Sequence, residues 1–535
     1  MSKAVLLAVN SKYVHSSLSV RVLAAGVSRY AWRAHEVEVV EATIHHADRD
    51  IAGRVSAFAP DVVGVSAYIW NAARLPGLLA ALRERLPDAV IVLGGPEASH
   101  NAGYWLARGA DRLLCGEGER SFPALLDALE GCENVRAETE PEEEPVDPYT
   151  EACLASLKGR IAYLETSRGC PFRCAFCLSG GSGVRFFPLE PVKERIDKLS
   201  RCGAKTVKLV DRTFNCDPGR AYTLFEYILG LDTDCRFHFE AAADLFDERT
   251  ISLLAGAPPG RIQLEAGLQS FHKPALRAVS GRMDLERAGR NIRALLRGGN
   301  IHIHLDLIAG LPYETLADGM DSFDRAWALG AHTLQLGFLK LLHGSALRGR
   351  AAALGIRYGA EPPYEIEGSP WLSAEDIQIL KNAENALRHT HNKGRFLSVL
   401  RYVLPASGLR PFALFRALGE GAPHHGTPLE EYAGQLYALC AGLSGVDAAE
   451  LRDRMICDWL GMVKGKNMPP FLKGPEGGRR QAAERAERRL GRKIGRGEAA
   501  ILSSGRGVFA DSADRDPVTG LYRLHFTEPE PVRPA

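Results

Sequence analysis

The chain has 535 residues with a formal net charge of +1; 46% of the residues are hydrophobic and 24% are charged. This length can bury several hydrophobic cores, and we expect about three domains. The balanced charge excludes an overall electrostatic attraction to nucleic acid or to a membrane surface.

Neither a secretory signal nor a membrane span is predicted. The first ten residues indicate a short buried strand that ends in polar residues, and no apolar run approaches the length of a bilayer span. The 11 cysteines show no disulfide-like framework, which suits a reducing compartment. We therefore expect a cytoplasmic protein with no membrane partner. Nucleic acid is not expected as a partner, but it is not excluded.

Residues 1–130 alternate short apolar strands with helix-length segments. This pattern predicts a doubly wound, Rossmann-like α/β sheet. The predicted strands are Ala4–Val9, Val37–Val40, Val62–Ser66, Val90–Leu93 and Arg112–Leu114.

Four loops of this domain follow predicted strands and should therefore meet at one edge of the sheet. Their candidate binding residues are Asn10, Tyr13, His15, Ser66, Trp70, Asn71, Gly94, Gly95, Glu117 and Gly118. Small residues at strand ends leave room for a large ligand. Paired glycines are also common in any doubly wound sheet, so a plain turn is the alternative.

Residues 131–155 are rich in proline and acidic residues, especially between Glu138 and Pro148. Such a composition cannot pack a core, and we expect a stiff linker or strap between two domains.

Three cysteines, Cys170, Cys174 and Cys177, follow the strand predicted over residues 161–164. This spacing lets three thiolates close around one metal centre from a single loop. On a [4Fe-4S] cluster, three protein sulfurs leave one iron open to bind a small molecule. The alternatives are three buried thiols or a zinc knuckle. A zinc knuckle needs a fourth ligand, and the next cysteines, Cys202 and Cys216, lie at a predicted helix end and in a strand-to-helix loop.

Residues 156–345 repeat a strand-then-helix pattern six times. The pattern predicts a partial (β/α)6 barrel of the TIM type, with its chemistry at the carboxyl ends of the strands. The predicted strands are Ile161–Leu164, Thr206–Val210, Phe237–Ala241, Arg261–Gly267, Ile301–Ile308 and Thr333–Leu339, and the predicted helices include Pro191–Arg201 and Asp284–Arg297.

Residues 346–535 predict a mainly helical domain, which we expect to recognise the substrate. Helical patterns cover Ala374–Ala386 and Leu429–Leu443, and a strand is predicted over Leu521–Phe526. Between Lys464 and Glu498, eleven basic and four acidic residues give a local excess of 11 − 4 = +7. This stretch could bind phosphates, but a solvated helix is favoured because acidic residues interleave and aromatic residues for base stacking are missing.

The cysteine spacing and Phe176, the aromatic residue before the last cysteine, resemble the signature of radical S-adenosylmethionine (SAM) enzymes. In that family the open iron of the cluster binds SAM, and one electron cleaves it to a 5'-deoxyadenosyl radical. The resemblance implies that Phe176, Glu265, Gln269 and Gly310 contact SAM. Glu265 matches the contact to the ribose or amino-acid part, and Gly310 belongs to a Gly-Leu-Pro turn. The Gly-Gly-Glu element that binds the SAM amine is absent, and Ser179–Gly183 is the candidate replacement.

The amino-terminal loops resemble the cobalamin-binding domain of one radical SAM class. Their paired glycines after the fourth strand and the Gly-Glu-Gly-Glu run after the fifth carry this resemblance. The Asp-x-His-x-x-Gly element that offers histidine to cobalt elsewhere is absent, so we expect no protein histidine below the cobalt.

Together these resemblances imply a cobalamin-dependent radical SAM enzyme that methylates an unactivated carbon of a small-molecule substrate. An external electron donor of the flavodoxin or ferredoxin type is implied as well. Three alternatives stay open. They are a radical cyclase or rearrangement enzyme like the anaerobic tetrapyrrole cyclases, a non-catalytic cobalamin sensor or carrier, and a tRNA methylthiolating enzyme. The last is disfavoured because the amino domain lacks a second cysteine trio.

Overall fold

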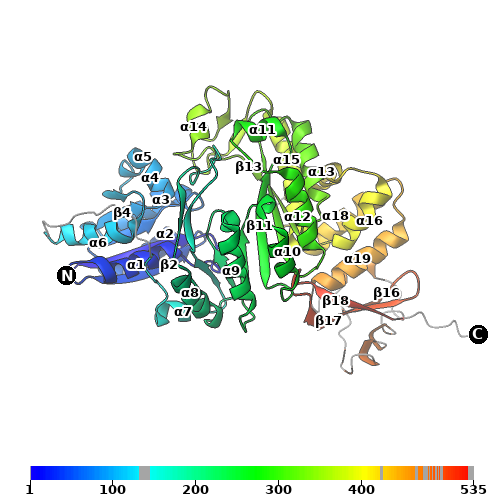
Figure 1. Cartoon of the computed structure of the whole chain (residues 1–535). Helices are drawn as coiled ribbons and strands as arrows, with labels where there is room; N and C mark the ends of the chain where they lie inside the picture. The colour runs from blue at the N-terminus through cyan, green and yellow to red at the C-terminus, as the bar shows by residue number, and fades with distance from the viewer. Residues whose placement is uncertain are drawn as a thin grey trace, which may run out of the picture.

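The computed structural model describes residues 2–131, 145–421, 426–463, 468–473 and 498–527, together with part of 480–493. Most of the predicted acidic linker and of the basic stretch 464–498 lies outside these residues. Three parts follow one another across the molecule: an α/β domain, a strand-and-helix barrel and a mainly helical region (Figure 1).

The amino-terminal domain is a five-stranded parallel sheet with the strand order β2-β1-β3-β4-β5. Its strands are β1 (Lys3–Asn10), β2 (Glu36–Thr43), β3 (Val62–Ser66), β4 (Val90–Gly94) and β5 (Arg112–Leu114). Because alternate residues of each strand point to opposite faces, the sheet supports two separate cores. Helices α1 (Leu18–Tyr30) and α6 (Gly118–Leu129) cover one face, and α2 (Asp48–Ser56) and α3 (Leu75–Arg85) cover the other. The doubly wound sheet predicted from the sequence is confirmed.

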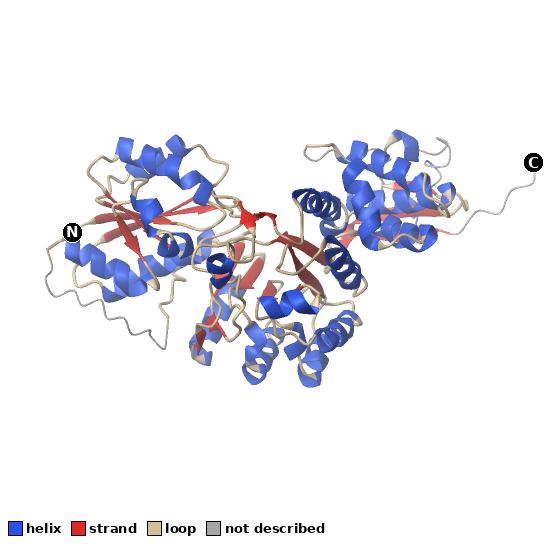
Figure 2. Ribbon diagram, turned by 90° about the horizontal axis from the view of Figure 1, so that it is seen from above, coloured by secondary structure: helices blue, strands red, loops and turns tan. Residues whose placement is uncertain are grey.

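The central domain is a parallel six-stranded sheet that curves into an incomplete barrel, with the strands in chain order. The strands are β6 (Ile161–Leu164), β9 (Thr206–Leu209), β10 (Arg236–Glu240), β11 (Ile262–Gln269), β12 (His302–Ala309) and β13 (Thr333–Phe338). The helices around it are α8 (Leu189–Arg201), α9 (Pro218–Leu229), α10 (Glu248–Ala255), α11 (Lys273–Ala278), α12 (Leu285–Leu296) and α13 (Leu316–Trp327). Figure 2 shows these helices around the strands. The predicted partial barrel is confirmed.

The inner wall of this barrel is polar, because apolar and polar residues alternate along its strands. In β10, Phe237 and Phe239 are buried against the helices, whereas His238 and Glu240 are partly exposed on the inner face. β11 and β12 show the same alternation. A closed TIM barrel fills its interior with apolar side chains, so this barrel instead has an interior suited to a polar ligand.

The neighbouring domains cover the two edge strands of the barrel. At β6, the Ile161 backbone donates to the Val14 carbonyl at 2.8 Å, and His15 forms a parallel bridge with Ile161. At β13, the Asn392 side chain accepts from the Leu334 N–H at 3.0 Å and donates to the Leu334 carbonyl at 2.8 Å. Both edges therefore have hydrogen-bond partners from outside the barrel.

Beyond the barrel, a hairpin of β14 (Arg357–Tyr358) and β15 (Ile366–Gly368) leads into a helical region. Its helices are α15 (Ala374–His389), α16 (Leu397–Ser407), α17 (Pro411–Gly421), α18 (Leu429–Ala441) and α19 (Ala448–Met462). A three-stranded antiparallel sheet follows, of β16 (Ala499–Ile501), β17 (Gly507–Arg515) and β18 (Tyr522–Thr527). The helical character is as predicted. Of the three strands, only β18 was predicted from the sequence.

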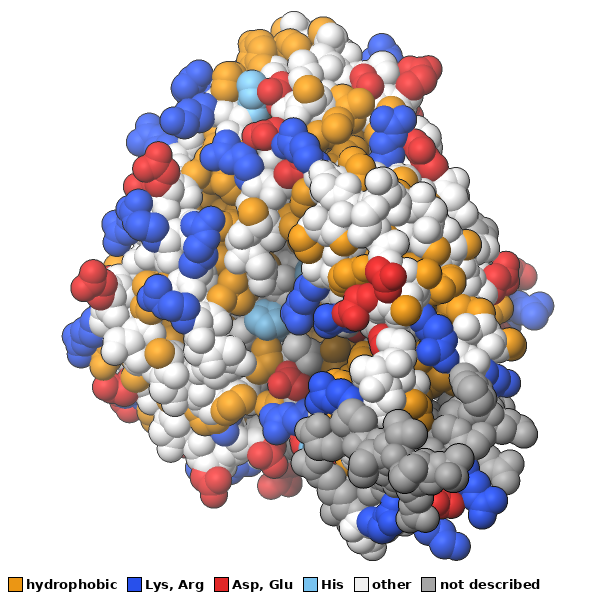
Figure 3. Space-filling model, turned by 90° about the vertical axis from the view of Figure 1, so that its right-hand side faces the viewer, with side chains coloured by type: hydrophobic (Ala, Val, Ile, Leu, Met, Phe, Trp, Pro, Cys, Tyr) orange, Lys and Arg blue, Asp and Glu red, His pale blue; other side chains and the backbone are white. Residues whose placement is uncertain are grey.

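On the described part of the face shown in Figure 3, basic and acidic side chains are interspersed. This mixture agrees with the small net charge of the whole chain. Within the part of the chain that the structure describes, no helix is long and apolar enough to cross a membrane.

Candidate functional site

The three neighbouring cysteines lie in a loop held by short strands. Cys170 is the last residue of β7 (Ser167–Cys170), which pairs antiparallel with β8 (Gly183–Phe186). The two strands are so close that a Cβ on Gly169 would lie 2.0 Å from the Gly183 carbonyl oxygen. The run Ser179–Gly183, the candidate replacement for the amine-binding element, is thus a turn that enters β8.

Backbone contacts from elsewhere in the barrel fix the middle of the cysteine loop. The Ala175 N–H donates to the Val279 carbonyl at 3.0 Å, and the Ala175 carbonyl accepts from the Leu347 N–H at 2.7 Å. Both partners are distant in sequence. The loop geometry is therefore set by the folded barrel.

The three thiols of this loop lie close together, since Cys170 and Cys177 both act on the ionisation of Cys174. Burial, followed by the nearby Cys177 and Cys170, raises the pKa of Cys174 to about 11. The Cys174 thiol is therefore protonated at neutral pH unless a bound metal takes it as a thiolate.

The two cysteines considered as fourth ligands lie in different surroundings. Cys202 follows α8, and its thiol donates to the Leu199 carbonyl. Cys216 follows β9; burial and then the nearby Cys170 raise the pKa of its thiol. Thr213, from the same turn, lies 3.5 Å from the Cys170 sulfur.

Asp211, two residues after the end of β9, holds the start of the cysteine-bearing strand. Its carboxylate accepts hydrogen bonds from the Thr166 N–H at 2.9 Å, the Thr166 hydroxyl at 2.6 Å and the Ser167 hydroxyl at 2.6 Å. Asp211 is buried, and this burial raises its pKa despite the three donors. This role of Asp211 was not predicted from the sequence.

A charged network lines the inner wall of the barrel. Glu265 accepts from His238 at 2.9 Å and from Lys208 at 3.2 Å, and Lys208 also lies 3.5 Å from Glu240. Burial opposes ionisation of Glu265, but His238 and Lys208 outweigh it and lower its pKa to about 2. Glu265 is therefore a carboxylate with partners on two neighbouring strands.

His304 and Asp306 extend this network on β12. Their side chains lie 3.0 Å apart, and His304 lies 3.9 Å from Glu265. Although Glu265, His304 and Asp306 have metal-ligand atoms, the Lys208 ammonium beside Glu265 disfavours a cation there. His304 and Asp306 were not predicted as site residues from the sequence. Their i, i+2 spacing on a predicted strand was the available signal, because it places them on one face.

The other residues predicted to contact SAM have varied surroundings. Gln269 ends β11 with a φ of 66°, and Phe176 is half-buried against the barrel core. Gly310 follows β12, and a Cβ there would lie 2.8 Å from the Ile366 side chain, which gives this glycine a packing role. Burial raises the pKa of nearby Glu314 to about 7, and Glu314 accepts a hydrogen bond from Ser270.

The candidate residues of the amino-terminal domain meet at the carboxyl edge of its sheet, but several of their side chains already contact other parts of the domain. Asn71 is buried; its side chain donates to the carbonyls of Val9 and Ser66 and accepts from the Tyr68 N–H. Trp70 is half exposed and stacks on Tyr68 at 4.2 Å.

The glycines at this edge allow close backbone packing. Gly95 follows Gly94, the last residue of β4, and has a φ of 103°. A Cβ on Gly95 would lie 2.7 Å from the Ala67 carbonyl oxygen, and one on Gly118 would lie 2.6 Å from Leu23.

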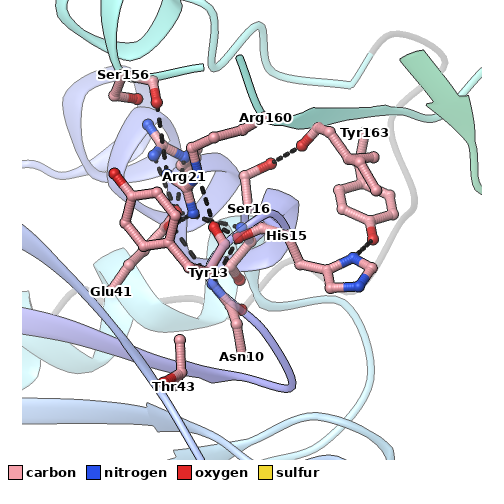
Figure 4. Close-up of polar contacts among 12 residues, drawn as sticks. Asn10, Tyr13, His15, Ser16, Arg21, Glu41, Thr43, Ser156, Arg160 and Tyr163 are labelled. Carbon is pink, nitrogen blue, oxygen red and sulfur yellow. Dashed lines mark hydrogen bonds and ion pairs between the residues drawn. The ribbon is translucent and has the colours of Figure 1, made fainter. Parts of the chain in front are cut away.

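The β1–α1 loop is attached to the barrel rather than free (Figure 4). His15 Nδ1 lies 2.6 Å from the Tyr163 hydroxyl of β6. Burial, and then nearby Lys12, lowers the pKa of His15. Asn10 donates to the His15 carbonyl, and the carbonyl of the exposed Tyr13 accepts from Arg160. His15 therefore has a partner in the barrel.

Glu117 and its neighbour Glu119, at the start of α6, meet arginines beside the cysteine loop. Arg168 lies 2.8 Å from Glu117 and 2.7 Å from Glu119, and Arg185 lies 2.8 Å from Glu117. The loop predicted to bind cobalamin is thus joined by ion pairs to β7 and β8.

Comparisons with known proteins identify all three parts of the chain. Residues 4–126 match the B12 binding domain, residues 164–326 match the radical SAM superfamily, and residues 352–493 match a protein family of unknown function, DUF4080. These matches confirm the two family resemblances predicted from the sequence.

Curated relatives include methyltransferases. A cobalamin-dependent radical SAM methyltransferase, TokK of Streptomyces tokunonensis, is 27% identical over 322 residues, which cover 51% of this chain and 46% of TokK. The hopanoid C-3 methylase of Methylococcus capsulatus is 24% identical over 305 residues, covering 51% of this chain and 58% of that enzyme. The chain thus spans about half the length of these relatives.

Two solved structures share the fold. The radical SAM methyltransferase TsrM of Kitasatospora setae, solved with cobalamin and a [4Fe-4S] cluster, has a TM-score of 0.54 at 20% identity and covers 70% of this chain and 82% of TsrM. The cobalamin-dependent enzyme OxsB, solved with aqua-cobalamin and SAM, has a TM-score of 0.59 at 13% identity and covers 85% of this chain and 78% of OxsB. The chain therefore contains a B12-binding domain and a radical SAM superfamily domain, followed by a DUF4080 region.

Proposed function

We propose that this protein is a cobalamin-dependent radical SAM methyltransferase that methylates an unactivated carbon of a small molecule. The observation that carries the proposal is the ion-paired contact between the cysteine loop and the carboxyl-edge loop of the B12-binding domain. It brings together the two parts of the chain that such an enzyme needs. When bound, the cluster supplies the electron that cleaves SAM, and cobalamin carries the methyl group.

Cys170, Cys174 and Cys177 would hold the cluster. The backbone of Ala175 and the Asp211 carboxylate fix the loop on both sides of Cys170. A preformed loop of this kind lowers the cost of ordering the three ligands when the cluster binds. With three protein sulfurs, one iron remains open for SAM.

Glu265, Gln269, Gly310 and Phe176 are the proposed SAM contacts. Glu265 is held as a carboxylate by His238 and Lys208, so it would accept hydrogen bonds from hydroxyl or ammonium groups. The same charged wall favours a polar substrate over a purely apolar one, because an apolar ligand would leave these groups without partners.

The proposed cobalamin contacts are the accessible residues of the carboxyl edge, with Trp70 and the Gly94–Gly95 turn foremost. His15 bonds to Tyr163, which supports the expectation that no protein histidine lies below the cobalt. Asn71 would act indirectly, since its side chain already bonds three backbone groups.

Relatives favour methyl transfer over cyclisation. TokK and the hopanoid C-3 methylase are methyltransferases by name, whereas an anaerobic magnesium-protoporphyrin IX monomethyl ester cyclase of Rubrivivax gelatinosus is 23% identical over 322 residues. The cyclase is the second candidate function. The mass of the product separates them, because methylation adds one CH2 and cyclisation does not.

An external electron donor of the flavodoxin or ferredoxin type and a cytoplasmic location are part of the proposal. The described cysteines are all free, as expected where an iron-sulfur cluster survives.

Anaerobic reconstitution with iron, sulfide and hydroxocobalamin tests the proposal. The reduced protein should convert SAM to 5'-deoxyadenosine. We predict that Cys174→Ala abolishes this product and leaves cobalamin retention intact, because the two cofactors bind different domains. Cys115→Ala, which removes an exposed thiol outside the loop, should behave like wild type. Wild-type protein that binds neither iron nor cobalt would refute the proposal. Loss of both cofactors in Cys174→Ala would refute the division between the domains.

A further inference from the structure

One arginine joins the cysteine loop to the B12-binding domain. Arg168 lies in β7, two residues before Cys170, and its side chain is three-quarters buried, with an exposed fraction of 26%. It contacts Glu117 at 2.8 Å, Glu119 at 2.7 Å and Glu165 at 2.7 Å. Glu165 belongs to the barrel, whereas Glu117 and Glu119 begin α6 of the other domain.

Arg168 supplies one of the two positive charges that hold the carboxylates of this network together. Arg168 and Arg185 are cross-strand partners in the β7–β8 pair, and three carboxylates surround them. With both arginines the group carries −3 + 2 = −1. Without Arg168 it carries −2, and Glu119 would face Glu165 with no cation between them. Repulsion would then push the α6 loop away from the barrel.

Both ends of this connection are rigid. On the barrel side, Thr166 and Ser167, immediately before Arg168, donate to the buried Asp211. On the other side, α6 packs so tightly on α1 that a Cβ on Gly26 would lie 2.4 Å from the Glu119 carbonyl oxygen. A change at Arg168 should therefore alter the separation of the two domains rather than be absorbed by either end.

We infer that Arg168 is a positioning residue that sets the distance between the cluster loop and the corrinoid loop. The inference rests on the proposed function. The planar guanidinium can contact three carboxylates at once, whereas an ammonium acts as a point charge. Arg168→Lys should therefore preserve the connection only in part, and Arg168→Gln should break it.

Two measurements test this role apart from turnover. The first is hydrogen exchange of the protein without cofactors, in which Arg168→Gln should raise exchange at residues 116–121. The second is the electron paramagnetic resonance of reduced protein reconstituted with iron, sulfide and hydroxocobalamin. Spin coupling between the cluster and Co(II) depends steeply on distance, so Arg168→Gln should lose the broadening of the Co(II) signal while retaining its iron. Arg168→Lys should lie between Arg168→Gln and wild type.

Tyr364→Phe is the matched control. It removes a different hydrogen bond to the B12-binding domain, from Tyr364 of the β14–β15 hairpin to Glu97 at 2.6 Å, without touching the cysteine loop. It should leave exchange at 116–121 and the broadening as in wild type. Wild-type exchange in Arg168→Gln would overturn the inference, and so would unchanged broadening. If wild-type protein binds neither cofactor, the proposed function fails, and the exchange experiment still decides the role of Arg168.

Discussion

Asp211 shows how a single buried side chain can stabilise the strand that leads into a binding loop. Its two oxygens accept three hydrogen bonds from Thr166 and Ser167, and each of these groups is buried. A carboxylate can accept all three, whereas an amide nitrogen can only donate.

We predict that Asp211→Asn destabilises the protein by about 1–3 kcal/mol, because its amide nitrogen would face a buried donor. The measurement is the urea midpoint of the cofactor-free protein. Asp217→Asn is the control, since Asp217 caps the exposed start of α9 with a single backbone hydrogen bond at 2.9 Å and should cost less. Equal midpoints for Asp211→Asn and wild type would contradict this account.

Residue roles inside the barrel were the hardest part to foresee. Glu265 was singled out by resemblance, but its partners Lys208 and His238 come from two other strands. Strand alternation shows which face a residue occupies, yet its neighbours across the sheet depend on the register of parallel strands that are far apart in the sequence. For the same reason, the sequence could place His15 in an edge loop but could not reveal its bond to Tyr163.

The edge strand β13 shows how one side chain can complete the backbone hydrogen bonds of a strand. Its outer side would expose unpaired backbone groups at Leu334, and Asn392 satisfies both the N–H and the carbonyl. The amide side chain thus replaces one residue of a neighbouring strand.

We predict that Asn392→Ala and Asn392→Asp both destabilise this edge, by about 1–3 kcal/mol. Aspartate can accept from the Leu334 N–H but cannot donate to its carbonyl, so the isosteric change isolates the donated bond. Hydrogen exchange at residues 333–338 is the measurement, with the exposed neighbour Lys393→Ala as control. Protection in Asn392→Asp equal to wild type would show that the donated bond contributes nothing.

The strand bounds predicted from the sequence were most accurate where apolar residues recur. The strands predicted at 62–66, 112–114 and 161–164 have those bounds in the structure. β7 and β8 were missed because each has only four residues and contains a glycine, which gives too short a pattern to indicate a strand. Helix α7 (Glu151–Ser156), which lies mostly within the predicted linker, is too short for a periodic signal.

At the scale of the whole molecule, the barrel depends on both flanking regions. The B12-binding domain meets it through His15 and through Glu119, which pairs with Arg168, and the carboxyl-terminal region meets it at Asn392 and Val518. Contacts between parts so far apart in sequence could not be predicted from local patterns. We therefore expect the parts to stabilise one another when the chain folds.

Partly buried histidines lie where the barrel meets the carboxyl-terminal region. His302, at the start of β12, has its ring 4.9 Å from that of His332, and its Nδ1 lies 3.3 Å from the Val518 carbonyl oxygen. His391 bonds to the Ala331 carbonyl at 3.1 Å. Burial, followed by nearby His332, lowers the pKa of His302 to about 4; burial likewise lowers that of His391 to about 4. All three rings contact barrel residues near the amino-terminal ends of β12 and β13.

We predict that these histidines destabilise the protein in mild acid. Below the ordinary histidine pKa of 6.5, the unfolded chain binds protons that the folded chain excludes. Stability is therefore complete above that pH and falls progressively towards pH 4. At pH 5 the loss should be about 2 kcal/mol for each of His302 and His391, measured as the shift in urea midpoint from pH 7.5. His302→Gln should reduce this shift, whereas His45→Gln, at an exposed site, should not. An identical pH dependence in His302→Gln and wild type would show that the acid sensitivity lies elsewhere.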